Sequence, residues 1–200
     1  VAPDKHQYIA DALRSGKVAV LPTHTVYGLA AHPDSDAAVD RIYQLKQRPK
    51  DFYLPILISK VDDLYALGLD VNKNAETILN SPFVPGAMTL VLGFAAAKRP
   101  NWLEGRAEVA VRIPNSAFLL AVIDRSGPLL ATSANRHRSQ ANITLVSEIL
   151  DDLNGEPDIV VDAGPLSFIP STIVNCIAEK IKVEREGQVT IEQLENYLNQ

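Results

Sequence analysis

The chain has 200 residues, a formal net charge of −5 and a single cysteine, Cys176. A chain of this length buries about 70% of its unfolded surface, enough for one core without disulfides or a structural metal. One cysteine excludes an intramolecular disulfide and a zinc site built from several cysteines. The negative charge excludes a chain-wide attraction to nucleic acid or to an anionic membrane. We therefore expect a single domain over residues 1–200, in a reducing, cytoplasmic compartment.

The first predicted elements are a helix and a buried strand. Asp4 is a suitable N-cap, apolar residues follow at helical spacing, and Gly16 marks the end of the helix. Val18–Leu21 is a short apolar run before Pro22, which predicts a strand buried on both faces. We expect Thr23–Gly28 to form the turn into which this strand opens.

The remaining elements alternate between the two periods. Strands are predicted for the apolar or β-branched runs Leu54–Ile58, Thr89–Phe94, Val109–Ile113, Leu129–Ala131, Ile159–Val161 and Thr172–Ile177. Helices are predicted for Asp36–Lys46, Asp62–Leu67, Ala75–Asn80, Ala117–Arg125, Leu145–Leu153 and Ile191–Leu198. Thr190 and Gln193 form a capping box before the last helix. This interleaving predicts an α/β or α+β domain with a mixed sheet, and the longest apolar run is too short to span a bilayer.

Polar side chains stand at the ends of the predicted strands. They are Thr23, Thr25, Arg112, Thr132, Ser133, Asn135, Ser171 and Thr172. Ligands of α/β sheets bind at strand ends, so we expect several of these residues to converge on one ligand. The alternative for each residue taken singly is turn formation or helix capping, which favour the same residue types.

A cluster of cations ends the predicted helix Asp36–Lys46. Lys46, Arg48 and Lys50 surround Pro49, which stops the helix. The helix dipole alone favours cations at this end. The functional interpretation is a phosphate clamp, in which Arg48 makes bidentate contacts and Lys46 supplies a point charge.

Several familiar catalytic patterns are missing from the sequence. Neither a P-loop nor a dinucleotide-binding fingerprint occurs, and the four histidines are scattered, so no protein-bound metal is predicted. Ser133 lacks a nucleophile-elbow context, and Cys176 lies in an apolar strand pattern that favours an inert, buried thiol. The chemistry is therefore expected to depend on positioning and charge neutralisation.

Five ordered motifs resemble those of the YrdC/TsaC family, the threonylcarbamoyl-AMP synthases. They are Leu21–Leu29, Lys46–Pro49, Pro85–Thr89, Val109–Arg112 and Thr132–Asn135. The resemblance runs from about Gly16 to Thr190, and the chain is similar to the short, single-domain form of the family. It implies a twisted mixed β-sheet flanked by helices, with a concave basic face. It also implies an enzyme that condenses L-threonine, bicarbonate and ATP, the last with Mg²⁺, into threonylcarbamoyl-adenylate and pyrophosphate.

The resemblance also implies roles for individual residues. Lys46 and Arg48, the implied catalytic pair, fall with Ser133, Asn135 and Arg185 on the family's ATP site. Thr25, Arg112, Thr132 and Ser171 fall on the threonine site. The implied basic cavity would gather Lys46, Arg48, Lys50, Arg112, Arg136, Arg138 and Arg185. Proteins that transfer the threonylcarbamoyl group to adenosine in tRNA are the implied partners.

Two alternatives stay open at this point. One is a non-catalytic RNA-binding module of the same fold, which would contact tRNA or double-stranded RNA; the low aromatic content and the negative charge are unfavourable for it. The other is a paralogue with a different substrate. The chain departs from the family in four places, and Phe52-Tyr53 and Leu57 also differ from many members but agree with the single-domain relatives, so two departures leave this alternative open. His24 stands where an acidic residue is usual, and Arg138 stands where a glycine is usual.

Overall fold

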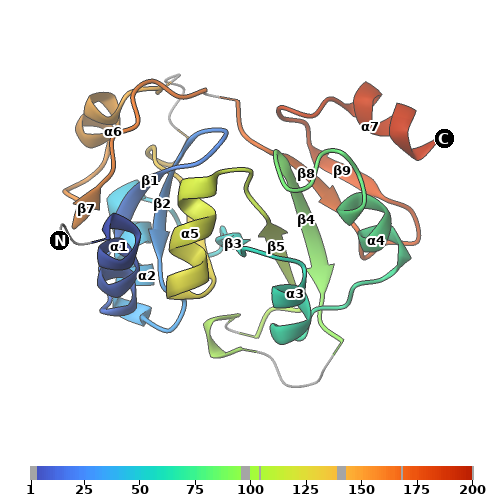
Figure 1. The fold of residues 1–200 in the computed structure, drawn as a ribbon, viewed down its shortest axis with the longest axis horizontal. Helices are drawn as coiled ribbons and strands as arrows, with labels where there is room; N and C mark the ends of the chain where they lie inside the picture. Colours follow the sequence, from blue (N-terminus) through green and yellow to red (C-terminus); the bar gives the residue numbers. More distant parts are fainter. Residues whose placement is uncertain (1–3, 96–99, 104, 139–142, 168, 200) are drawn as a thin grey trace.

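The structure, a computed structural model, is organised around one nine-stranded sheet and describes residues 4–95, 100–103, 105–138, 143–167 and 169–199 (Figure 1). The described helices are α1 (Lys5–Arg14), α2 (Asp36–Lys46), α3 (Asp62–Ala66), α4 (Lys73–Leu79), α5 (Ala117–Ser126), α6 (Val146–Asp152) and α7 (Ile191–Leu198), with a 3-10 turn at Asn101–Leu103. The strands are β1 (Ala19–Pro22), β2 (Tyr27–Ala31), β3 (Ile56–Leu57), β4 (Met88–Gly93), β5 (Glu108–Arg112), β6 (Leu129–Ser133), β7 (Ile159–Val160), β8 (Thr172–Asn175) and β9 (Lys182–Arg185).

The sheet is mixed, as the alternation of elements predicted. Its strand order is β7-β1-β2-β6-β3-β5-β4-β8-β9. The pairs β1–β7, β3–β5 and β4–β8 are parallel, and the other neighbours are antiparallel. Strands far apart in the sequence are therefore adjacent: Gly28 lies opposite Ser133, and Met88 lies beside Thr172. The predicted twisted mixed sheet flanked by helices is confirmed.

Two of the described strands were not predicted, and several strand ends differ from the predictions, as at β3 and β8, which are shorter than expected. Thr23–Gly28 was expected to be a turn only, but its last two residues begin β2, which returns antiparallel to β1. No strand was predicted at β9, whose sequence is largely charged and whose side chains are mostly exposed at the sheet edge. β6 continues through Thr132 and Ser133 instead of ending at Ala131, because both residues pair with β2.

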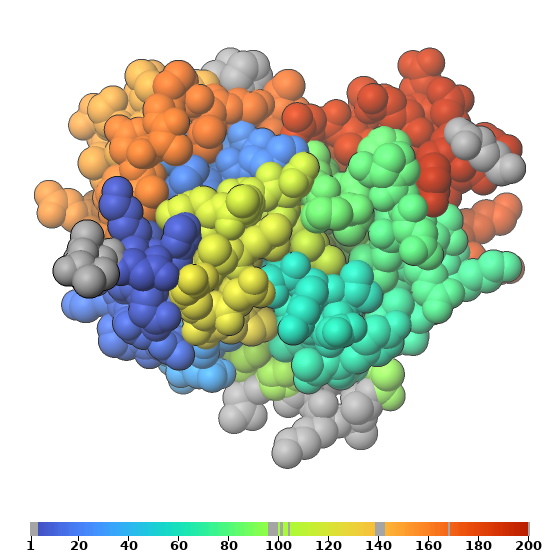
Figure 2. All heavy atoms as spheres, in the orientation of Figure 1, coloured from blue at the N-terminus to red at the C-terminus, as the bar shows by residue number. Residues whose placement is uncertain are grey.

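Helices cover both faces of the sheet. In Figure 1, α1 and α5 lie side by side in front of β1 and β2, and α2 lies behind these strands. Ile9 and Leu13 of α1 join Leu119 and Ile123 of α5 in one buried cluster with the strands. A larger core lies between the sheet and α2, α3 and α4. Figure 2 shows α5 in yellow between the blue N-terminal helix and the green segments that precede β4.

Local signals in the sequence explain where the helices begin and end. Asp4 caps α1 by accepting a hydrogen bond from the backbone N–H of His6, and Gly16 follows the helix with a φ of +84°. The capping box of Thr190 and Gln193 is confirmed at α7. α2 ends at Gln47, whose left-handed backbone (φ 49°) turns the chain before Arg48.

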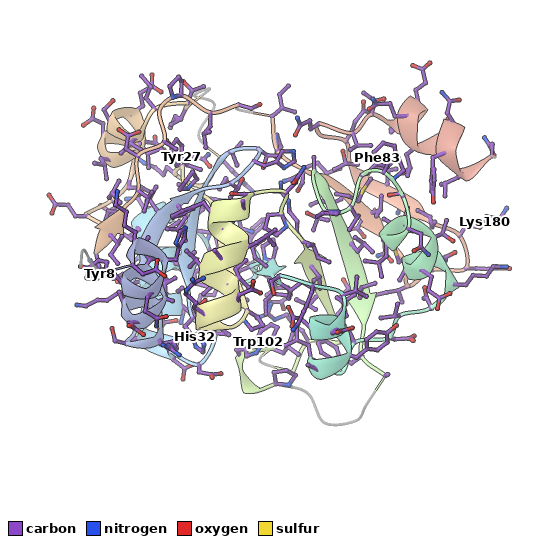
Figure 3. All side chains as sticks on the ribbon, in the orientation of Figure 1. Tyr8, Tyr27, His32, Phe83, Trp102 and Lys180 are labelled. Atoms are coloured by element: carbon purple, nitrogen blue, oxygen red, sulfur yellow. The ribbon has the colours of Figure 1, made fainter. Side chains whose placement is uncertain are left out.

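Side-chain contacts tie β2 and the loop before β4 to later segments of the chain. The Tyr27 hydroxyl, on β2, donates to the carbonyl oxygen of Gly164 at 2.6 Å. The rings of Phe83 and Tyr197 pack edge to face with centroids 6.1 Å apart, which holds α7 against the loop before β4. Both Tyr27 and Phe83 are labelled in Figure 3. None of the described helices is long and apolar enough to cross a bilayer.

Candidate functional site

A pocket of about 250 Å³ lies over the middle of the sheet. It is walled by strands from β2 to β9 and by the segment that follows α2. The lining residues are Thr23, Val26, Gly28, Arg48, Tyr53, Pro55, Leu57, Thr89, Ala110, Arg112, Ala131, Thr132, Ser133, Pro170, Ser171, Ile173 and Arg185. Six of the nine predicted site residues therefore line one pocket, although they come from five distant stretches of the sequence.

Arg112, at the end of β5, is the most buried cation of the pocket wall, with 7% of its surface exposed. Its Nε donates to the carbonyl oxygen of Gly86 at 2.8 Å, and its Nη1 donates to Thr25 Oγ1 at 2.9 Å. Its Nη2 lies 3.3 Å from His24 Nδ1. Burial, with a smaller contribution from the positive charge of Arg185, lowers the pKa of Arg112 to about 10. The guanidinium is therefore charged at neutral pH and held in one orientation.

Arg48 and Arg185 lie on the rim of the same pocket. Arg48 donates from Nε to the carbonyl oxygen of Phe52 at 2.8 Å and from Nη2 to that of Tyr53 at 3.1 Å. Arg185 donates to the carbonyl oxygen of Ser171 at 2.7 Å. Burial is the main cause that lowers the pKa of each, and the positive charge of Arg48 adds to the effect on Arg185. The three arginines are thus close enough to repel one another.

The positive charge of these arginines has no acidic partner in the described part of the chain. None of the ion pairs found there involves Arg48, Arg112 or Arg185. Asp51 raises the pKa of Arg48 but forms no ion pair with it. Like charges gathered without ion-pair partners cost folding free energy, which a bound anion would offset. The pocket therefore has the local charge to attract an anion, although the chain as a whole is acidic.

The predicted cavity of seven cations is corrected by the structure, which leaves only these three at the pocket. Lys50 is turned away to pair with Asp40 at 2.6 Å. The backbone and side chain of Arg136 both bond to Asp152. Arg138 lies 5.8 Å from the ring centre of Phe52. These cations satisfy local partners, which sequence proximity to the motifs does not reveal.

Lys46 lies beneath the pocket and is only 1% exposed. Lys46 is the last residue of α2, and its Nζ donates to the backbone carbonyl oxygens of Ser133 and Asn135. Burial, then the nearby charge of Arg48, lowers the pKa of Lys46 to about 7, although Asp152 opposes the shift. Ser133 reaches the pocket, whereas the Asn135 side chain donates to the Arg136 carbonyl at 3.1 Å. Lys46 therefore holds the segment 133–135 in place.

Hydroxyl groups form the polar floor between the arginines. Thr23 Oγ1 donates to the carbonyl oxygen of Val26 at 2.6 Å and lies 3.1 Å from Thr25 Oγ1. Thr89 and Ser171 share a buried hydrogen bond of 2.8 Å. The predicted residue Thr25 does not line the pocket itself but reaches it through Arg112. These groups can accept or donate to a small polar ligand.

Three contributors were not assigned a site role from the sequence. Tyr53 lines the pocket, and the guanidinium of Arg106 lies 4.0 Å from its ring centre. Thr89 supplies a hydroxyl, and Gly86 supplies the carbonyl that holds Arg112. Thr89 and Gly86 belong to the motif Pro85–Thr89, which was the available signal. For Tyr53 the sequence offered no such signal.

The nucleophilic and metal-binding residues do not gather in the described structure. Cys176 is buried, and burial raises the pKa of its thiol to about 12, so it is an inert core residue, as predicted. Among the described residues, no group of three or more histidine, cysteine, aspartate or glutamate side chains could hold a metal ion.

Comparisons with known proteins show the family of the chain. The Sua5/YciO/YrdC family model, described as "Telomere recombination", matches residues 11–187. Threonylcarbamoyl-AMP synthase of Bacillus subtilis is 35% identical over 93% of this chain, and the match covers 54% of that relative. The chain thus spans about half the length of the curated relatives that it matches first.

Solved structures show the same fold. The Pyrococcus abyssi Sua5 structure in complex with L-threonine has a TM-score of 0.86 and 31% identity, covering 97% of this chain and 57% of Sua5. Escherichia coli YciO has a TM-score of 0.80 and 25% identity, covering 92% of this chain and 89% of YciO. Because the family model matches residues 11–187 and the solved relatives share the fold, the chain belongs to the Sua5/YciO/YrdC family.

Proposed function

We propose that this protein is a threonylcarbamoyl-AMP synthase, which condenses L-threonine, bicarbonate and ATP into threonylcarbamoyl-adenylate and pyrophosphate. The observation that carries the proposal is the pocket lined by Arg48, Arg112 and Arg185, none of which forms an ion pair with a described residue. Every substrate of this reaction carries an anionic group. The similarity to a synthase and to a Sua5 structure with bound L-threonine supports the same assignment.

The threonine end of the pocket is assigned to Arg112 and the hydroxyls around it. Arginine presents a planar pair of donors that matches a carboxylate or a carbamate. Thr25 fixes Arg112 from one side, while Thr132 and Ser171 line the wall. We assign these four residues to binding threonine and its carbamate, because together they offer one fixed charge and several orientable hydroxyls.

The ATP end is assigned to the rim. Arg48, Arg185 and Ser133 contact the phosphates, and Lys46 with Asn135 shapes the segment beside them. When a carbamate oxygen attacks the α-phosphorus, the bond to pyrophosphate breaks and negative charge grows on the leaving group. Arginines already in place stabilise that charge without reorganising. We propose Lys46 and Arg48 as the catalytic pair. Arg48 contacts the phosphates, and Lys46 acts by positioning the segment 133–135 beside them. Mg²⁺ enters with ATP as part of the substrate.

The product determines the partners that we propose. Threonylcarbamoyl-adenylate is a mixed anhydride, which water hydrolyses, so it must pass promptly to proteins that transfer the group to adenosine in tRNA.

We place the protein in the cytoplasm as a single domain over residues 1–200. Direct binding of tRNA or double-stranded RNA belongs to the alternative function, a non-catalytic RNA-binding module.

Threonine-dependent release of pyrophosphate tests the proposal. Purified protein with ATP, bicarbonate and L-threonine should release pyrophosphate, and the matched reaction without threonine should not. A threonine-independent signal, or no signal in either reaction, contradicts the synthase. RNA affinity that falls steeply with salt, together with no binding of ATP, would identify the RNA-binding module instead.

A further inference from the structure

The contact between His24 and Arg112 defines the protonation state of the histidine. Arginine has only donors and remains protonated, so Nη2 must be the donor and His24 Nδ1 the acceptor over the 3.3 Å that separates them. An imidazole that accepts at Nδ1 is neutral and carries its proton on Nε2. His24 is half-buried in the segment between β1 and β2, where it faces the guanidinium.

His24 completes a set of three acceptors around Arg112. Gly86 takes the Nε donor, Thr25 takes one Nη1 donor and His24 takes one Nη2 donor. An arginine has five N–H donors, so one remains on each terminal nitrogen. Those two donors are the number that a bidentate carboxylate requires. Without His24, only the hydrogen bonds to Gly86 and Thr25 would hold the guanidinium in its orientation.

We propose that His24 is a positioning residue, whose neutral imidazole holds Arg112 so that its two remaining donors meet the carboxylate or carbamate of the small substrate. This inference rests on the proposed function for the identity of that substrate. His24 itself does not line the pocket, and it acts through Arg112.

The proposal makes substrate binding dependent on pH. Protonation would place a donor on Nδ1 against the donor of Arg112 and set two positive charges side by side. The charged group that acts on His24 is Arg112, because its own segment, Thr23–Val26, and the facing loop, Ser81–Ala87, have no other ionisable side chain. Burial, then Arg112, lowers the pKa of His24 below its ordinary value of 6.5. Affinity is therefore complete at neutral pH and is lost as the pH falls below that value.

Two substitutions separate this role from a purely structural one. His24→Asn keeps an acceptor near the position of Nδ1 but cannot ionise, and His24→Ala removes the acceptor. Calorimetric titration with L-threonine between about pH 5.5 and about pH 8 should show wild-type affinity falling with pH and a flatter profile for H24N. At about pH 8, H24A should bind threonine about three- to tenfold more weakly than wild type, because the orientation of Arg112 is lost, and this difference should shrink as the pH falls. In turnover, KM for threonine should change more than kcat.

Two results would overturn the role of His24. One is an H24N profile that falls with pH as steeply as wild type, which would assign the dependence to another group such as Lys46, whose pKa is about 7. The other is H24A with unchanged threonine affinity. Circular dichroism at each pH confirms that the variants are folded.

A measurement without substrate keeps this inference separate from the proposed function. ¹⁵N NMR of the histidine side chains should show the Nε2–H tautomer for His24 at neutral pH. A proton on Nδ1 would contradict the contact with Arg112 whatever the protein binds. Wild-type protein that binds no threonine at any pH would instead contradict the synthase, and the tautomer would still show whether His24 holds Arg112.

Discussion

Lys46 and Arg48 are two residues apart, yet they occupy different environments. Lys46 is enclosed and bonded to two backbone carbonyl oxygens, whereas Arg48 is half-buried on the pocket rim. The left-handed Gln47 between them ends α2 and redirects the chain, so the two side chains separate. We therefore assign phosphate contact to Arg48 and support of the neighbouring segment to Lys46.

Substitution of Arg48 by alanine should weaken ATP binding. A charge-assisted contact is worth about 1.5 to 3 kcal/mol, so the dissociation constant should rise about ten- to a hundredfold. Isothermal titration with ATP measures this change. Arg14→Ala is the matched control, because Arg14 is an exposed arginine paired with Asp11 on α1. Equal ATP affinity in R48A and R14A would remove Arg48 from the phosphate site.

The contacts of individual arginines could be predicted from the sequence only in part. The bidentate potential of Arg112 was predicted from its type and its place at a strand end, but its three partners come from two other segments. The positive φ of Arg138, +60°, is a backbone conformation that favours glycine, the residue that the resemblance to the family implies at this position. Its contact with Phe52 depends on the path of another loop.

Arg112 belongs to β5, but the loop before β4 helps to hold its side chain in place. The carbonyl of Gly86 accepts from Arg112, and its N–H donates to the carbonyl of Ile113 at 2.9 Å. A Cβ at Gly86 would lie 2.6 Å from the carbonyl oxygen of Phe83, which is backbone and cannot rotate away. The loop therefore admits no side chain here without moving.

Gly86→Ala should accordingly disturb both stability and threonine binding. The clash is expected to cost about 1 to 3 kcal/mol of unfolding free energy, as for other over-packed sites. Urea denaturation and a threonine titration measure the two effects. Gly93→Ala is the control, because the nearest atoms to its added Cβ lie at 4.0 Å. A G86A protein as stable as G93A, with unchanged threonine affinity, would show that the loop does not hold Arg112.

Elements differed in how well their own sequences predicted them. β1 is apolar throughout and buried, and α7 has a capping box, so both were predicted from local pattern. β2 contains glycine and alanines, whose strand propensity is low, and it forms because it pairs with β1 and β6. β9 is a charged edge strand, where one neighbour, β8, supplies the pairing.

At the scale of the whole molecule, net charge and local charge have opposite signs. The chain carries −5 overall, while the pocket gathers three arginines that form no ion pair within the described part of the chain. Some of the surface acids pair with other cations, as Asp158 does with Arg41. The pocket therefore has a positive electrostatic potential, and its volume of about 250 Å³ limits the size of the anion that it could hold.

Polyanionic ligands should therefore stabilise the folded protein. ATP at about a hundred times its dissociation constant adds about 2.7 kcal/mol to the unfolding free energy. For a chain of this size that raises the melting temperature by about 5 to 10 °C. Differential scanning fluorimetry with ATP, and with adenosine as the uncharged control, measures the effect. An equal shift with adenosine would contradict a site dominated by phosphate contacts.

The sequence by itself determined the features that depend on local pattern: the helices with caps, the buried first strand, the inert Cys176 and the motifs that show the family. The tertiary structure decided which cations share a pocket. Lys50 and Arg136 lie close in sequence to site residues but pair elsewhere, while Arg185 arrives through β9 from a distant segment. The physical reason is that periodicity acts over a few residues. Convergence of charges depends instead on strand pairings such as Met88 with Thr172, which join distant parts of the chain.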